Sequence, residues 1–225
     1  MKKAIVLLSG GLDSATTLYL ARKQGYKCFA LSFDYGQRHK KEIESAKKIA
    51  QAAKSPLQLI KIRLPWKGSS ILDKKLRIPE RYNAITQKRN NGIPSTYVPA
   101  RNIIFLSFAL SFAEAIKAEA IFIGANAVDF SGYPDCRPEF YRAFKEVILT
   151  GTKAGVEKIG IKIQTPLIGK TKARIIRTAS QLGVPFALTW SCYQGGRVPC
   201  EECDSCYYRA KGFLEAGIRD PLVSM

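Results

Sequence analysis

Short apolar segments alternate with longer amphipathic ones along most of the chain. The apolar segments are rich in branched and aromatic residues, which is typical of buried strands. The predicted strands are residues 3–9, 27–33, 57–62, 120–124 and 161–164. The predicted helices are residues 13–24, 40–53, 101–117 and 170–182. Because strands alternate with helices, the pattern predicts an α/β fold, a parallel sheet with helices on both faces.

Two of the predicted helices differ in polarity. Residues 40–53 have Ile43, Ala46 and Ile49 on one face and lysines elsewhere, which is a clean amphipathic pattern. Residues 101–117 are apolar almost all round. We therefore expect this second helix to be buried against the sheet.

The stretch from residue 64 to residue 99 interrupts the alternation. It contains four prolines and an Asn-Asn-Gly turn signal at 90–92. It is too long for a plain connection in a compact domain. It is either a flap over the active site or a disordered insert, and we favour the flap because Tyr97 and Arg101 lie at its exit.

A glycine-rich loop follows the first predicted strand. It reads Ser9-Gly10-Gly11-Leu12-Asp13-Ser14 and leads into the first predicted helix. The free N–H groups and the positive dipole end of a helix N-terminus bind phosphate. Gly10 and Gly11 lack a Cβ, so the chain can turn tightly and bring its amides close to an anion. We expect Asp13 to cap the helix or to bind Mg²⁺ beside a polyphosphate.

This loop resembles the PP-loop of the N-type ATP pyrophosphatases, which activate a carbonyl oxygen by transferring AMP from ATP. It lacks the Lys-Ser/Thr pair that ends a Walker A loop. The resemblance implies ATP as a ligand and an adenine nucleotide alpha hydrolase-like nucleotide-binding fold. The expected ATP-binding residues are Leu8, Ser9, Gly10, Gly11, Leu12, Asp13, Ser14, Ala15, Thr16, Thr17 and Leu18.

Composition sets further limits. The 225 residues (25.0 kDa) are 46% hydrophobic and 24% charged, which predicts one folded core with a small appendage. No apolar run reaches the roughly 18–20 residues of a membrane span, and the first residues lead straight into a strand, so we expect a cytoplasmic protein without membrane contact. The net charge of +18 suits polyanions, but much of it lies on solvated helix faces. We do not expect direct tRNA binding.

Four of the six cysteines lie close together: Cys192, Cys200, Cys203 and Cys206. Without an export signal, this spacing indicates a metal rather than disulfides. Zn²⁺ is the leading candidate and an iron–sulfur cluster is the competitor. Four thiolates leave no open position, so one structural zinc per chain is expected. The chain would then divide into an ATP-binding catalytic domain (1–190) and a zinc-binding region (191–225).

Six further motifs span nearly the whole chain. They are residues 33–39, 98–102, 124–126, 129–140, 165–168 with Lys172, and 191–193 with Arg209. Together with the loop and the cysteines, they resemble the 7-cyano-7-deazaguanine (preQ0) synthase family of queuosine and archaeosine biosynthesis. Arg174 stands where that family more often has an acidic residue, and Glu201 where glycine is usual. These departures leave open the charge near Lys172 and the turn geometry of the metal site.

The resemblance implies an ATP-dependent conversion of 7-carboxy-7-deazaguanine and ammonia to 7-cyano-7-deazaguanine, through an activated carboxylate and an amide. The enzyme would be a ligase that forms C–N bonds, and the family suggests a homodimer. Its small-molecule substrates would be the deazaguanine acid, ammonia and ATP with Mg²⁺.

The resemblance also supplies candidate site residues. The expected catalytic residues are Asp13, His39, Arg101 and Lys172. The two cations would stabilise the departing pyrophosphate, and His39 is either structural or a proton carrier. The expected substrate-binding residues are Asp129, Phe130, Tyr133, Asp135 and Arg137. A carboxylate suits the N–H groups of a guanine-like base, an aromatic ring stacks on it, and an arginine pairs with the substrate carboxylate.

Two other functions compete with this reading. A PP-loop tRNA-modifying thiolase or ligase would use the same loop, but it normally needs a tRNA-binding domain for which 225 residues leave little room. A persulfide-carrying thiolase also needs reactive cysteines outside the metal site, and only Cys28 and Cys136 remain. The third reading is a nucleic-acid-binding zinc module with a vestigial loop, which steep salt-dependent tRNA affinity without ATP turnover would identify.

Overall fold

The computed structural model describes residues 1–79, 93–126 and 132–223. In this part of the chain, five strands form one parallel sheet in the order β3-β2-β1-β4-β5. The strands are β1 (Lys3–Leu7), β2 (Lys27–Asp34), β3 (Leu57–Lys61), β4 (Ala120–Ile123) and β5 (Lys162–Gln164). The predicted parallel α/β sheet is thereby confirmed, with strand ends that differ by one or two residues.

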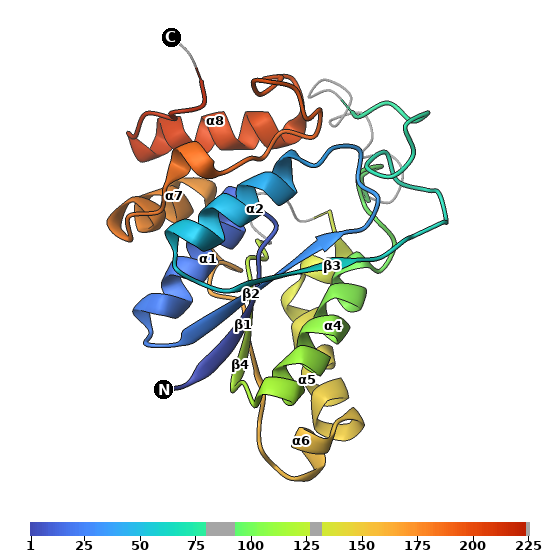
Figure 1. The fold of residues 1–225 in the computed structure, drawn as a ribbon. Coiled ribbons are helices and arrows are strands. Elements are labelled where there is room, and N and C mark those ends of the chain that lie inside the picture. Colours follow the sequence, from blue (N-terminus) through green and yellow to red (C-terminus); the bar gives the residue numbers. More distant parts are fainter. Residues whose placement is uncertain (80–92, 127–131, 224–225) are drawn as a thin grey trace.

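Helices cover both faces of the sheet, as Figure 1 shows. One layer contains α1 (Leu12–Lys23), α2 (Lys41–Ala52), α7 (Lys172–Gln181) and α8 (Asp204–Ala216). The other contains α4 (Arg101–Ile116), α5 (Pro138–Gly151) and the short α6 (Lys153–Val156). Two 3-10 turns, η1 (Pro134–Cys136) and η2 (Phe186–Leu188), complete the described elements.

The central strand β1 divides its side chains between two cores. Ala4 and Val6 face the core that contains α1, α2, α7 and α8. Ile5 and Leu7 face the core that contains α4 and α5. Because side chains alternate along a strand and both faces are covered, β1 reads as a continuous apolar run.

Helix α4 is buried on one side only. Leu106, Ala109 and Ala113 are fully buried against the sheet. Ile103 and Phe108 are 43% and 40% exposed on the other side of the helix. The expectation that this apolar helix is buried therefore holds for its inner face and is wrong for its outer face, because no described element covers α4 from outside.

Helices α5, α6 and α8 were not among the predicted elements. For α5 a signal was present, because Tyr141, Phe144 and Ile148 recur at helical spacing and all three are buried. For α8, the sequence was interpreted as a metal-binding segment, and no helix was predicted there. That helix packs against α7, and its Phe213 lies in the same core as α1.

A buried ion pair lies within the chain's C-terminal part, and its arginine also contacts the segment before residue 190. The Arg209 guanidinium donates to both Asp220 carboxylate oxygens at 2.6 and 2.9 Å, and both side chains are 5% exposed. Arg209 also donates to Thr189 Oγ1. The proposed division at residue 190 stays a prediction. Within the described ranges, no helix combines the length and the apolar character that a bilayer span requires.

The sheet order sets the position of a ligand site. The order reverses next to β1, since β2 lies on one side of it and β4 on the other. In open parallel sheets, ligands bind outside the carboxyl ends of the strands at such a switch point. The Ser9–Ser14 loop follows β1 and therefore lies at this point.

Candidate active site

The glycine-rich loop is held by its own serines. Ser14 Oγ accepts from the backbone N–H of Ser9 at 3.2 Å and donates to the carbonyl of Gly11. The two hydroxyls of Ser9 and Ser14 lie 3.0 Å apart. Helix α1 begins at Leu12 with Gly11 as N-cap and no side-chain cap. The first amides of α1 are therefore free for an anion, and the idea that Asp13 caps the helix is wrong.

Gly10 is the position where the loop requires glycine. Its φ is +90°, and a Cβ there would lie 2.1 Å from the backbone oxygen of Glu42 in α2. The backbone N–H of Trp190 donates to the Gly10 carbonyl at 2.9 Å. The loop is thus clamped between α2 and the segment that precedes the cysteines.

Asp13 forms an ion pair with Lys172, the first residue of α7. The Lys172 Nζ lies 2.7 Å from each carboxylate oxygen, and both side chains are mostly buried. The backbone of Gly124, after β4, packs against the same turn, since a Cβ on Gly124 would lie 2.9 Å from Asp13 and Ser14 backbone atoms. Two residues that are 159 positions apart in the sequence are brought together here.

A cavity of about 330 Å³ opens beside the loop. One part of its wall is polar and carries Ser9, Gly11, Asp13, Ser14 and Lys172. Another part of the wall is aromatic. It carries Phe33, Tyr35, Phe105, Tyr133, Trp190, Tyr193 and Tyr208. A polar phosphate-binding part next to an aromatic part suits a nucleotide together with a flat heterocyclic substrate.

The second half of the predicted ATP-binding stretch does not reach this cavity. Ala15, Thr16, Thr17 and Leu18 are fully buried in α1. The two threonine hydroxyls donate to the carbonyls of Leu12 and Asp13 inside the helix. The stretch that faces the cavity is therefore Leu7 to Ser14, without Gly10.

Arg101 lies in the cavity wall at the start of α4. Its Nη1 donates to the Tyr35 hydroxyl at 3.4 Å. Burial opposes its charge, but the nearby Tyr35, Tyr133 and Asp135 raise the pKa of the guanidinium. Arg101 therefore stays protonated and presents a fixed positive charge to the cavity.

Glu42, which sequence reasoning missed, lies in the same wall. It comes from the first turn of α2. Burial raises the pKa of its carboxyl to about 7, and the positive charge of Arg101 partly offsets this effect. Its position in a lysine-rich amphipathic helix made it look like an ordinary surface acid, so no local signal could have identified it.

The predicted substrate-binding residues separate into three groups. Tyr133 lines the cavity, and its hydroxyl lies 2.6 Å from Thr96 Oγ1. Asp135 is buried beneath the wall, where it accepts from the backbone N–H of Asn102 at 3.1 Å, and Arg137 is exposed at the start of α5. The geometry therefore brings neither Asp135 nor Arg137 into the cavity. Asp129 and Phe130 lie outside the described residues.

His39 lies away from the ATP-facing wall. Its ring lies near the backbone of Cys192 and Tyr193, and burial lowers its pKa. A Cβ on Gly195 would lie 2.3 Å from the His39 ring, so the metal-site loop packs directly on it. Because His39 does not line the large cavity, this arrangement favours its structural role over that of a proton carrier there.

The described parts of the 64–99 stretch cover the cavity. Ile71 and Thr96 line it, and the two halves are joined because Ser70 N–H donates to the Ser95 carbonyl at 2.8 Å. Residues 80–92 of this stretch lie outside the described residues. The flap remains a prediction that these contacts support.

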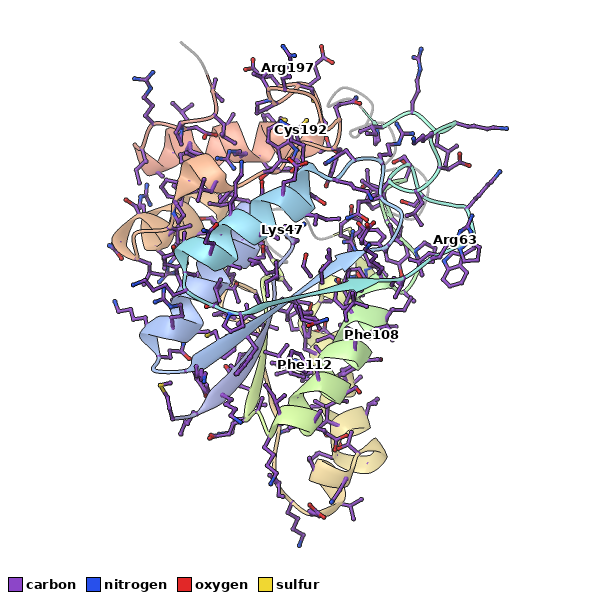
Figure 2. All side chains as sticks on the ribbon, in the orientation of Figure 1. Lys47, Arg63, Phe108, Phe112, Cys192 and Arg197 are labelled. Atoms are coloured by element: carbon purple, nitrogen blue, oxygen red, sulfur yellow. The ribbon has the colours of Figure 1, made fainter. Side chains whose placement is uncertain are left out.

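The four clustered cysteines form a compact thiol site (Figure 2, where Cys192 is labelled). The sulfurs of Cys192, Cys200, Cys203 and Cys206 all lie within 4.8 Å of one another. A tetrahedral ion with metal–sulfur bonds of about 2.3 Å places its sulfurs about 3.8 Å apart. Backbone N–H groups of Gln194 and Cys200 donate to Cys192 Sγ at 3.3 Å. The donor set therefore fits a single thiolate-bound metal ion.

The thiol site and the cavity share residues. Trp190 lines the cavity, packs in the cluster with Cys192, Cys203 and Cys206, and donates through Nε1 to the Cys192 carbonyl at 2.9 Å. Its indole ring also lies under Lys41, with 4.5 Å between the Lys41 Nζ and the ring centroid. Binding a metal at the cysteines would therefore stabilise one wall of the active-site cavity.

Residues 3–217 match the family model described as "Queuosine biosynthesis protein QueC". The chain belongs to the QueC family. A QueC-family relative from Trichormus variabilis, named 7-cyano-7-deazaguanine synthase, is 52% identical over 223 residues, which cover 98% of this chain and 97% of the relative. One of the same name from Picrophilus torridus is 52% identical over 222 residues, covering 99% and 91%. The expected family, an ATP-dependent ligase-type enzyme of queuosine biosynthesis, is thereby confirmed.

Solved structures outside the QueC family share its fold. An NMN synthetase from Francisella tularensis has a TM-score of 0.51 at 15% identity, covering 99% of this chain and 79% of that one. A 4-thiouridine synthetase in complex with RNA and bound ATP has a TM-score of 0.50 at 20% identity, covering 96% and 50%. The nucleotide-binding fold expected from the PP-loop is therefore confirmed.

Proposed function

We propose that this chain converts 7-carboxy-7-deazaguanine and ammonia to 7-cyano-7-deazaguanine at the expense of ATP. The observation that carries the proposal is the shared cavity, in which the glycine-rich loop lies beside an aromatic wall and the Arg101 guanidinium. Relatives of matching length are named for this product.

The first step activates the carboxylate. A carboxylate resists attack because its leaving group would be oxide. Its oxygen attacks the α-phosphorus of ATP, the bond to the β-phosphate oxygen breaks, and pyrophosphate leaves. The first amides of α1 would bind the phosphates, while Arg101 and Lys172 would stabilise the charge that builds on the pyrophosphate.

Ammonia completes the sequence in two stages. Its nitrogen attacks the carbonyl carbon of the adenylate, AMP leaves with the bonding electrons, and the released proton goes to solvent. The amide oxygen then attacks a second ATP in the same way, with release of pyrophosphate. Loss of AMP and of two N–H protons forms the nitrile, so one loop serves both activations.

Two metals have separate places in this scheme. Asp13 would hold Mg²⁺ with the ATP phosphates, and the ion would offset their negative charge. Zn²⁺ would bind Cys192, Cys200, Cys203 and Cys206, where the close mutual spacing of the sulfurs favours one ion over a multi-iron cluster, whose thiolates bind different irons. With four thiolates the zinc is structural and supports the cavity wall through Trp190.

The deazaguanine base would stack on an aromatic side chain of the cavity wall. Tyr133 is the described candidate from the predicted set, and Asp129 and Phe130 remain candidates from the family resemblance. Because Asp135 and Arg137 lie outside the cavity, we assign the substrate carboxylate to Arg101, which lines the same cavity as the glycine-rich loop.

A homodimer is part of the proposal, with α4 as the contact. The exposed positions of its outer face carry no charge: Ile103, Ser107, Phe108, Ser111 and Ala115. Figure 2 shows Phe108 and Phe112 projecting from this helix. In a chain with a net charge of +18, an uncharged apolar face is the surface that a second copy can approach without repulsion. We also propose a cytoplasmic protein that does not bind tRNA directly.

The tRNA thiolase alternative loses support at its cysteines. Burial raises the pKa of both Cys28 and Cys136 to about 11. A thiol that stays protonated at neutral pH is a poor sulfur carrier. Cys136 lines the cavity, and its sulfur accepts a hydrogen bond from Asn102 Nδ2 at 3.4 Å.

The test is direct. The purified, zinc-loaded protein is incubated with ATP, Mg²⁺, ammonium and 7-carboxy-7-deazaguanine, and the product is identified by mass. We expect the nitrile, with the amide appearing first. An intact protein that forms neither product would refute the proposal, and ATP-independent tRNA binding by the same preparation would favour the zinc-module reading instead.

A further inference from the structure

A side cavity of about 30 Å³ adjoins the main cavity. Glu42, Arg101 and Tyr193 line both spaces and so form the boundary between them. The loop between β2 and α2 contributes Arg38 and His39 to the side cavity alone. A space of this size holds one or two molecules as large as water.

Polar groups without partners surround this side cavity. His39 Nδ1 and Arg38 Nε are buried and have no hydrogen-bond partner in the part of the chain that the structure describes. No described residue forms a direct hydrogen bond or ion pair with the Glu42 carboxylate, although Arg101 is near. Buried polar groups are nearly always paired, so the two unpartnered nitrogens point to a ligand, and the half-buried Glu42 carboxylate lines the same space.

The three groups differ in what they require. His39 Nδ1 lies at the side cavity without a partner among the described residues and can pair with a ligand there. The Glu42 carboxylate is an acceptor. Arg38 Nε is a donor, since its guanidinium is otherwise bound to the carbonyls of Asp73 and Leu76. The ligand must therefore donate to Glu42, accept from Arg38 and pair with His39.

We propose that the side cavity binds ammonia, the nitrogen substrate, before it attacks the adenylate. This inference rests on the proposed function. Ammonia offers three N–H donors for Glu42 and His39 and one lone pair for Arg38. Two guanidinium groups, Arg38 and Arg101, outweigh the one carboxylate of Glu42, so the net positive charge favours the neutral molecule over ammonium. A dedicated place for ammonia beside the adenylate favours amide formation over hydrolysis by water.

Glu42→Gln tests the site through a change in one Michaelis constant. We expect the KM for ammonium to rise about tenfold or more, as for the loss of one charged hydrogen bond. The KM values for ATP and the deazaguanine acid should stay within about twofold of wild type, as should the rate at which pyrophosphate forms without ammonium. Glu44→Gln, an exposed acid on the same helix, is the matched control and should behave as wild type.

A second variant tests the size of the cavity. Ile71 lines both spaces, so Ile71→Ala should admit methylamine. Its nitrogen would displace AMP from the adenylate, with one proton released to solvent, and the N-methyl amide would be detected by mass. Wild type and the neighbouring control Leu72→Ala should form none of this product or at least tenfold less.

The outcomes separate this inference from the function on which it rests. A wild type that forms no nitrile refutes both. If wild type forms the nitrile and Glu42→Gln changes only the KM for the deazaguanine acid, Glu42 binds the base. If the KM for ammonium is unchanged in a folded Glu42→Gln variant and Ile71→Ala still excludes methylamine, the cavity holds only water. Either of these last two results overturns the ammonia site alone.

Discussion

The backbone N–H of Trp190 donates to the carbonyl of Gly10 at 2.9 Å. Gly10 belongs to the phosphate-binding loop, and Trp190 lies two residues before the first cysteine of the thiol site. A metal bound at the cysteines would therefore be connected through Trp190 to the loop that we propose binds ATP. Loss of the metal should therefore weaken the binding of the nucleotide.

Cys203→Ser tests this connection. Loss of one thiolate should release zinc, lower the folded yield and, in the protein that remains folded, raise the KM for ATP because Trp190 no longer fixes the loop. Zinc content, thermal unfolding and ATP kinetics measure these effects. Cys28→Ala, which changes a buried cysteine outside the cluster, should keep the zinc. A zinc-free variant with wild-type stability and kinetics would contradict the prediction.

Lys172→Gln tests the cation that pairs with Asp13. We expect kcat to fall about 100-fold, the size of effect produced by removing one group that stabilises developing charge. Arg174→Gln is the control, because Arg174 is exposed on the same helix. Measured rates of pyrophosphate release report the step itself. Equal losses in the two variants would show that only the net charge of this helix matters.

Gly10→Ala should disrupt the loop through contact and not only through backbone strain. Its Cβ would meet the Glu42 carbonyl oxygen at 2.1 Å, so α2 or the loop must move. We expect nucleotide turnover to be lost and the thermal midpoint to fall. Gly36→Ala is the matched control, because Gly36 also has a positive φ, +88°, but no atom within 4 Å. It should suffer only the strain of about 1–2 kcal/mol.

Glu201→Gly should stabilise the protein. Glu201 has a φ of +60° in the turn between Cys200 and Cys203, a conformation that glycine adopts without strain. The family usually has a glycine at this position, and the positive φ of Glu201 explains that preference. We expect a gain of about 0.5–1 kcal/mol, seen as a rise of a few degrees in Tm. Glu202→Gly, without a positive φ, should give no gain.

Phe108→Glu tests the outer face of α4 as a dimer contact. A charge in the centre of an apolar interface is costly, so the variant should elute as a monomer while wild type elutes as a dimer in light-scattering chromatography. Val156→Glu places the same charge on an exposed apolar residue of α6 and should leave the dimer intact. A wild type that is monomeric at micromolar concentration would refute the proposed contact.

Most of the architecture could be predicted from the chain. The apolar runs around Val6 and Phe122 and the amphipathic segment around Ile49 report strands and helices directly, because burial on a sheet imposes their periodicity. Helix α5 carried the same signal in Tyr141 and Phe144 and was overlooked. The outer face of α4 could not be predicted, since a sequence shows that a residue is apolar and not whether another element covers it.

The sequence by itself determined the glycine-rich loop, the four-cysteine cluster and the family, because each depends on residue types at short, fixed spacing. Only the tertiary structure decided which distant side chains meet. It paired Asp13 with Lys172, removed Asp135 and Arg137 from the cavity, and placed Glu42 in it. These positions depend on how the sheet order and the helix packing bring separate segments together. Local periodicity in the sequence does not determine that arrangement.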